Sequence, residues 1–214
     1  MATYHNETEQ LAAIKQWWDK NAKSVIVGVA TGVGLLFGWQ AWQTHQLNQG
    51  MAASDQYAEL QKVLKAEPEQ TASITAGADQ LLQDYPGTVY AVLAGRQAAK
   101  AAYQQGDKAN ARSYLERALA SAADYPVMEQ AIRVQLVELL IDLRAWQDAE
   151  QVLQAASEAS FTAQIAALRG DLAYHQGNLA AARAAYQQAA DQQSEPDPLL
   201  TLKLSDLGPD PSQE

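Results

Sequence analysis

The sequence of 214 residues contains no cysteine, only three histidines, and 15 Lys+Arg against 25 Asp+Glu. The absence of cysteine excludes a disulfide scaffold, a cysteine-ligated zinc site and a thiol nucleophile. The histidines are far apart in the sequence, which argues against a histidine-rich metal site. The net charge of the protein is -10, which argues against the basic surface that binding to a phosphate backbone requires. We therefore expect no metal, no cofactor and no nucleic-acid partner.

Charge is also absent from one long stretch, because no Asp, Glu, Lys or Arg lies between Lys23 and Asp55. Within it, residues 25–42 read VIVGVATGVGLLFGWQAW. Eighteen helical residues rise about 27 Å, close to the roughly 30 Å hydrocarbon core of a bilayer. Four of the five tryptophans flank this run, where aromatic rings favour the membrane interface: Trp17, Trp18, Trp39 and Trp42. The pattern predicts a transmembrane helix over residues 24–42, in contact with the lipid bilayer.

Two other interpretations of the apolar run are weaker. A buried helix of a soluble domain accounts for the apolar residues but not for the tryptophans at both ends. A cleaved signal peptide is disfavoured because the preceding region is long and no small-residue cleavage site follows. The tripeptide at positions 39–41, Trp-Gln-Ala, matches such a site poorly.

The basic residues near the span predict its orientation. Lys15, Lys20 and Lys23 precede it, whereas the first lysine after it is Lys62. By the positive-inside rule, the N-terminus remains cytoplasmic and the chain after the span is translocated. The first 50 residues contain three basic and three acidic residues, so the net charge of -10 belongs to the exported part. Absence of cysteine fits an oxidising compartment.

The segment before the span, residues 1–23, is a short cytoplasmic tail. Leu11, Ile14, Trp17 and Trp18 recur at near-helical spacing, which predicts a short amphipathic helix against the membrane surface. Such a tail is too short to form a domain.

Glycines recur at intervals of four residues within the span, as Gly28 with Gly32 and as Gly34 with Gly38. Pairs of small residues at this spacing allow another transmembrane helix to approach closely. Small residues also reach this spacing by chance in a glycine-rich span. We hypothesise that the four glycines form a helix-packing face, with tolerated glycines as the alternative.

The exported part is rich in Ala, Leu, Gln and Glu and shows no strand-like alternation. Proline- and glycine-containing turn signals separate segments of about 12 to 20 residues, a length typical of helices. We expect an all-α domain over residues 43–207 and a flexible tail over residues 208–214. Besides the repeat helices described next, the expected helices cover residues 43–66, 72–84, 89–104, 128–143, 161–175 and 197–207.

Three segments of this domain, starting at Gly106, Arg144 and Gly177, share a pattern of small, large and small residues. The small residue lets two helices approach, and the large residue four positions later fills the adjoining groove. This is the tetratricopeptide-repeat pattern. A left-handed helix end favours Gly or Asn before each second helix, so Arg144 predicts a less regular middle turn. The packing residues are Ala111, Leu115 and Ala118, then Ala149, Leu153 and Ala156, then Ala182, Tyr186 and Ala189.

The predicted fold is therefore one N-terminal transmembrane helix followed by a tetratricopeptide-repeat-like α-solenoid. The order of the motifs resembles the YfgM-type ancillary subunits of the SecYEG translocon. The resemblance rests on the N-terminal segment 7–10, on Trp17-Trp18, on the glycine-rich run 27–39 and on the last repeat, 167–183.

This resemblance implies a single-pass protein of the bacterial inner membrane with a periplasmic repeat domain. Its implied partners are SecYEG, the membrane-anchored periplasmic chaperone PpiD and exported client proteins. Its implied function is to link exported proteins to periplasmic chaperones. The resemblance also implies an alternative, regulation of an envelope stress response through the cytoplasmic tail.

An enzyme is disfavoured, because the sequence shows no phosphate-binding loop, metal-ligand spacing or Ser-His-Asp constellation. Stacked helix pairs instead present a concave surface, which favours a binding module. Because the exported domain is acidic, we expect an acidic groove that takes basic or amphipathic segments. Tyr103, Tyr114 and Tyr174 are candidate contact residues, although tyrosines at helical spacing are more often core residues.

Overall fold

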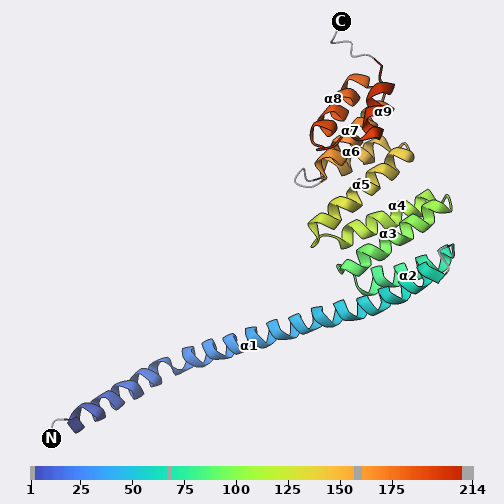
Figure 1. The fold of residues 1–214 in the computed structure, drawn as a ribbon. Helices are drawn as coiled ribbons and strands as arrows, with labels where there is room; N and C mark the ends of the chain where they lie inside the picture. Colours follow the sequence, from blue (N-terminus) through green and yellow to red (C-terminus); the bar gives the residue numbers. More distant parts are fainter. Residues whose placement is uncertain (1–2, 67–68, 157–160, 209–214) are drawn as a thin grey trace. The chain divides into compact units, whose positions relative to one another are not determined.

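The computed structural model describes residues 3–66, 69–156 and 161–208, with side chains from residue 11 onward except residue 13. Its described residues form helices and short connections without strands, which confirms the all-α prediction (Figure 1). The helices are α1 (Thr3–Ala66), α2 (Thr71–Asp84), α3 (Val89–Gln104), α4 (Lys108–Ser121), α5 (Pro126–Asp142), α6 (Trp146–Gln154), α7 (Thr162–His175), α8 (Leu179–Asp191) and α9 (Pro198–Asp206). The expected tail residues 209–214 lie outside the described part.

The chain divides into two compact units, residues 1–49 and residues 50–214. The first unit consists of the N-terminal part of α1. This helix is continuous where the sequence predicted three successive helical segments. Its sequence contains no proline, so no residue removes an N–H group from the helical hydrogen-bond ladder.

In the first unit, large apolar side chains of α1 such as Val29, Leu35 and Phe37 are exposed. Among the described residues, α1 is the one helix long and apolar enough to cross a membrane. It is therefore a candidate transmembrane helix, and its predicted limits of residues 24–42 remain a prediction.

The second unit is a series of helix pairs. Consecutive helices pack in the pairs α3/α4, α5/α6 and α7/α8, and α5 also contacts α7 (Figure 1). The end of α1 begins the series, because Leu60 is buried and lies against Gly77 of α2. The helix α9 closes it by packing Leu200 on α8. Each pair buries a face that a single helix would expose.

The turn inside each pair has the same hydrogen-bond pattern. Gly106 and Gly177 adopt left-handed conformations, with φ of 79° and 78°. Arg144 adopts the same conformation, with φ of 57°, and its N–H donates to the Ile141 carbonyl at 3.0 Å. The prediction of a less regular middle turn is therefore wrong: packing of the flanking helices imposes the left-handed conformation on an arginine despite its steric cost.

Candidate partner-binding groove

The predicted repeat-packing residues lie in the interior of the second unit. They come from the second helix of each pair, where small side chains allow close contact with the first helix. Eight of the nine are less than 10% exposed: Ala111, Leu115, Ala118, Ala149, Leu153, Ala182, Tyr186 and Ala189. Ala156 follows the end of α6 and is half-buried against the same core.

The four glycines of the span have open space around them. A Cβ atom built on Gly28, Gly32, Gly34 or Gly38 meets no other atom within 4 Å. No described side chain of this protein therefore uses the space above these glycines. Their role in packing against a helix of another protein stays a prediction.

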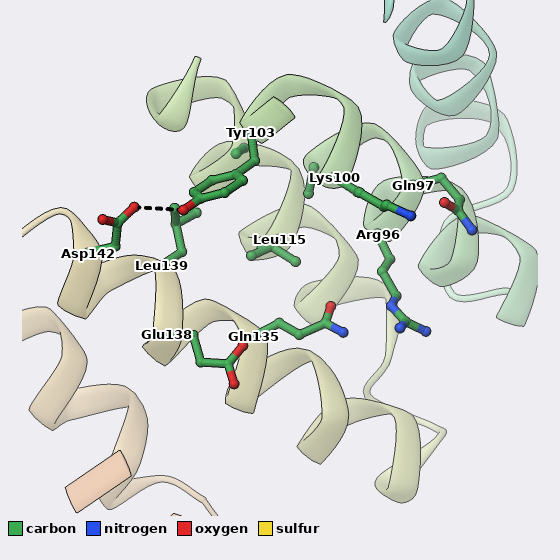
Figure 2. Close-up of a pocket in the computed structure, with 11 residues that line it drawn as sticks. Arg96, Gln97, Lys100, Tyr103, Leu115, Gln135, Glu138, Leu139 and Asp142 are labelled. Carbon is green, nitrogen blue, oxygen red and sulfur yellow. Dashed lines mark hydrogen bonds between the residues drawn. The ribbon is translucent and has the colours of Figure 1, made fainter. Parts of the chain in front are cut away.

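A groove of about 490 Å³ lies between α3, α4 and α5. Figure 2 shows Leu115 and Leu139 between polar side chains of α3 and polar side chains of α5. Leu115 and Leu139 are only 5% and 6% exposed, so they form an apolar floor beneath polar walls. An apolar floor with a few convergent polar groups is the general character of a binding site.

The α3 wall of the groove carries Arg96, Lys100 and Tyr103. The opposite face of this helix is alanine-rich and buried. Because these three residues are spaced by four and then three positions, they lie on the same exposed side of the helix. Arg96 lies beside the Gln135 amide, 3.0 Å from its oxygen in the orientation that satisfies both groups. Tyr103 is 47% exposed, so its ring is available at the rim of the groove.

The α5 wall carries Gln135, Glu138 and Asp142. Asp142 Oδ2 accepts a hydrogen bond from Lys108 Nζ at 2.8 Å and from the Tyr103 hydroxyl at 3.2 Å. The hydrogen bond from Lys108 holds the pKa of Asp142 below its ordinary value. This carboxylate therefore ties α3, α4 and α5 together at one end of the groove.

Glu138 and Asp142 also line a neighbouring hollow of about 740 Å³, together with Trp146 and His175. The Trp146 and His175 rings stack with centroids 5.4 Å apart. Partial desolvation raises the pKa of Glu138, and the negative charge of Asp171 raises it further. Because the two hollows share two carboxylates, they form a continuous surface from α3 to α7.

The charge of the groove differs from the prediction. Its charged lining residues are Arg96, Lys100, Glu138 and Asp142, so formal positive and negative charges are equal. The lining of this groove is therefore not acidic, contrary to the expectation from the net charge of the domain. Sequence composition records the total charge but not the helix face on which each charge lies.

The candidate contact tyrosines have different environments. Tyr103 lines the groove, whereas Tyr114 is buried and its hydroxyl donates to Asp79 Oδ2 at 3.1 Å. Tyr174 is exposed on α7, with its ring edge-on to His175. Only Tyr103 therefore belongs to the groove that α3 and α5 form.

Sequence reasoning missed the basic pair Arg96 and Lys100 and the facing carboxylates Glu138 and Asp142. A signal was present: two cations four residues apart on an otherwise alanine-rich helix. Like charges at this spacing destabilise a helix slightly, so such a pair indicates a role outside helix formation. The sequence of α3 or α5 alone does not predict that the two helices face each other across the groove.

Within residues 3–66, 69–156 and 161–208, no group of three or more His, Asp or Glu side chains is arranged to hold a metal ion. The groove combines an apolar floor, charges of both signs and an exposed tyrosine. These are the components of a protein–protein contact surface.

Comparison with protein families connects this architecture to known proteins. Residues 15–209 match the family model of the tetratricopeptide repeat-like domain. A Haemophilus influenzae protein named ancillary SecYEG translocon subunit is 32% identical over 97% of this chain and 100% of its own length. Its Escherichia coli K12 namesake is 26% identical over 97% of this chain and 99% of its own length. A third namesake, from Aggregatibacter actinomycetemcomitans, is 31% identical over 89% of this chain.

The fold also resembles a solved structure, that of BtubC (BKLC) from P. vanneervenii. The TM-score is 0.50 and the sequence identity is 15%, and the match covers 76% of this chain and 82% of that chain. At this identity the likeness concerns the fold alone.

Proposed function

The chain belongs to the family of ancillary SecYEG translocon subunits, and we propose that it is a membrane-anchored, non-catalytic binding subunit of that translocon. The observation that carries the proposal is the combination of two features on one chain. The helix α1 exposes a charge-free apolar run, and the repeat domain contains a groove whose cations are not paired with its own carboxylates.

In this proposal the repeat domain is periplasmic and the N-terminus is cytoplasmic. The three lysines before the span and the absence of basic residues directly after it support this orientation. The repeat domain links exported proteins to periplasmic chaperones, among them the membrane-anchored chaperone PpiD. Its helix pairs supply a rigid surface for such contacts.

Site-specific photo-crosslinking in intact membranes tests the proposed partners. A photoreactive residue at Leu36 is expected to capture a translocon subunit, because this side chain is 71% exposed on α1. One at Gln97, in the groove, is expected to capture a periplasmic chaperone or an exported protein. The matched control is Glu150, an exposed residue of α6 outside the groove. Failure to recover any translocon subunit from Leu36 or neighbouring span positions would overturn the proposal.

Cysteine labelling tests the orientation, because the chain has no cysteine of its own. Ser113→Cys places a thiol on the exposed side of α4, and Thr3→Cys places one in the tail. In cells with a permeabilised outer membrane, an impermeant maleimide should label position 113 and not position 3. Labelling of position 3 alone would reverse the orientation.

A further inference from the structure

The α3–α5 groove contains two cations that have no acidic partner among the described residues, in a strongly acidic protein. Elsewhere in the described part of the second unit, many basic residues pair with a carboxylate within 4.0 Å: Lys62, Lys108, Arg112, Arg117, Arg133 and Lys203. Arg96 and Lys100 make no such pair within the residues that the structure describes, and both are exposed. With 25 acidic residues in the chain, a shortage of carboxylates does not explain this.

The geometry of the walls keeps these charges apart. Arg96 and Lys100 extend from α3, whereas Glu138 and Asp142 extend from α5, with Leu115 between them (Figure 2). Asp142 is already bound by Lys108 and Tyr103, so it is not available to Lys100. The α3 wall is therefore a positively charged strip beside an apolar floor.

From these observations we infer that the α3–α5 groove binds a short extended segment of a partner protein through acidic side chains. A carboxylate of the segment contacts Arg96 and Lys100, and an apolar side chain next to it contacts Leu115 and Leu139. Because successive side chains of an extended segment point to opposite sides, acidic and apolar residues alternate in the sequence that fits. This inference rests on the proposed function and specifies the partner chemistry of its groove.

The dimensions limit the length of the segment. From Arg96 to Tyr103 the α3 wall rises about 10 Å, at about 1.5 Å per helical residue. An extended chain covers that length with about three to four residues, at roughly 3.3 Å per residue. The segment is therefore a short motif within a larger partner, and its affinity by itself is low.

Peptide binding to the full-length chain in lipid nanodiscs tests the inference. The probe is a hexapeptide, GDLDLG, acetylated and amidated so that it has no terminal charge, and carrying an uncharged fluorophore. We expect it to bind about three- to tenfold more tightly than the matched GNLNLG peptide by fluorescence anisotropy. Raising the salt concentration from 50 to 500 mM should reduce this preference. Equal binding of the two peptides at low salt would overturn the inference.

Two further measurements assign the contact. Arg96→Gln or Lys100→Gln should remove most of the preference, and the charge-retaining Arg96→Lys and Lys100→Arg variants should keep it. Lys65→Gln is the matched control, since Lys65 is an exposed lysine outside the groove. An unchanged preference in both Gln variants, with the helical circular-dichroism spectrum intact, would contradict the assignment. So would equal binding by GNLNLG with a free C-terminus, because a terminal carboxylate would then be the ligand.

The result of the peptide-binding test can be distinguished from the result of the crosslinking test of the proposed function. Crosslinking of α1 to a translocon subunit without acidic-peptide binding would refute the groove inference alone. Acidic-peptide binding without any translocon crosslink would refute the proposed function and leave the chemistry of the groove established.

Discussion

A Cβ atom on Gly170 of α7 would overlap the ring of Tyr186 on α8. The ring cannot easily move, because its hydroxyl donates to Asp171 Oδ1 at 2.7 Å and only 3% of the residue is exposed. Lys203 Nζ lies 5.6 Å from the ring centroid and also binds Asp171. In the last helix pair, the Tyr186 ring thus occupies the space that a side chain at position 170 would need.

Gly170→Ala should therefore destabilise the domain by about 1 to 3 kcal/mol, the usual cost of overpacking a well-packed site. Urea unfolding monitored by circular dichroism measures this loss. In the first pair, Ala99 and Leu115 occupy the positions equivalent to Gly170 and Tyr186. We expect Tyr186→Leu to make Gly170→Ala less costly, with a coupling of more than about 0.5 kcal/mol in a double-mutant cycle. Additive effects would show that the two residues do not constrain each other.

Arg144 offers a stabilising substitution. Its left-handed conformation costs an ordinary residue about 1 to 2 kcal/mol, part of which glycine recovers despite its greater freedom in the unfolded chain. Arg144→Gly is expected to raise the free energy of unfolding by about 0.5 to 1 kcal/mol. The matched control, Gly106→Ala, should change stability in the opposite direction. A loss of stability in Arg144→Gly would mean that the arginine side chain contributes more than its backbone costs.

The hydrogen-bonded ion pair between Lys108 and Asp142 predicts that the stability of the folded protein depends on pH. Because Lys108 lowers the pKa of Asp142 below its ordinary value of 3.8, the folded protein keeps this carboxylate charged at a lower pH than the unfolded chain does. The stabilising contribution is present above pH 3.8 and is lost as the pH falls through the lower folded-state value. Carboxyl-carbon NMR titration should show the pKa of Asp142 rising in Lys108→Gln and not in Lys62→Gln. An unchanged pKa would remove Lys108 as the cause.

The glycines of the span are predicted to affect packing against a partner helix and not the stability of the repeat domain. Gly32→Leu fills open space on α1, so the thermal unfolding temperature of the repeat domain should stay unchanged. If another helix packs on this face, the substitution should reduce translocon crosslinking from Leu36 several-fold. Ala30→Leu is the matched control, with a similar increase in side-chain volume two positions away on the helix. Equal crosslinking in both variants would favour the alternative of tolerated glycines.

Much of the fold follows from local sequence. The segment between the turn at positions 85–87 and Gly106 predicts a helix over residues 89–104, which are the bounds that α3 has. Glycine and capping signals define such ends because they act within a few residues. The turn at Arg144 could not be predicted this way, since the residue itself disfavours the conformation that its neighbours impose.

The groove was less predictable than the helices. Tyr103 was a candidate contact residue and lies in it, but the groove was expected to be acidic, whereas its formal charges balance. That Lys100 and Glu138 line the same groove depends on how α3 and α5 rotate about their axes. That rotation is decided by packing of buried residues such as Ala99 and Leu139.

The sequence by itself determined that the chain has one charge-free apolar span and a helical repeat domain, since both depend on local composition and periodicity. Only the tertiary structure decided which charges face one another and which have no oppositely charged partner among the described residues. Helical spacing puts Arg96 and Lys100 on one face of α3, and stacking of the helix pairs sets that face beside the apolar floor of the groove. A side chain's partners depend on contacts between elements far apart along the chain, which periodicity within one helix does not encode.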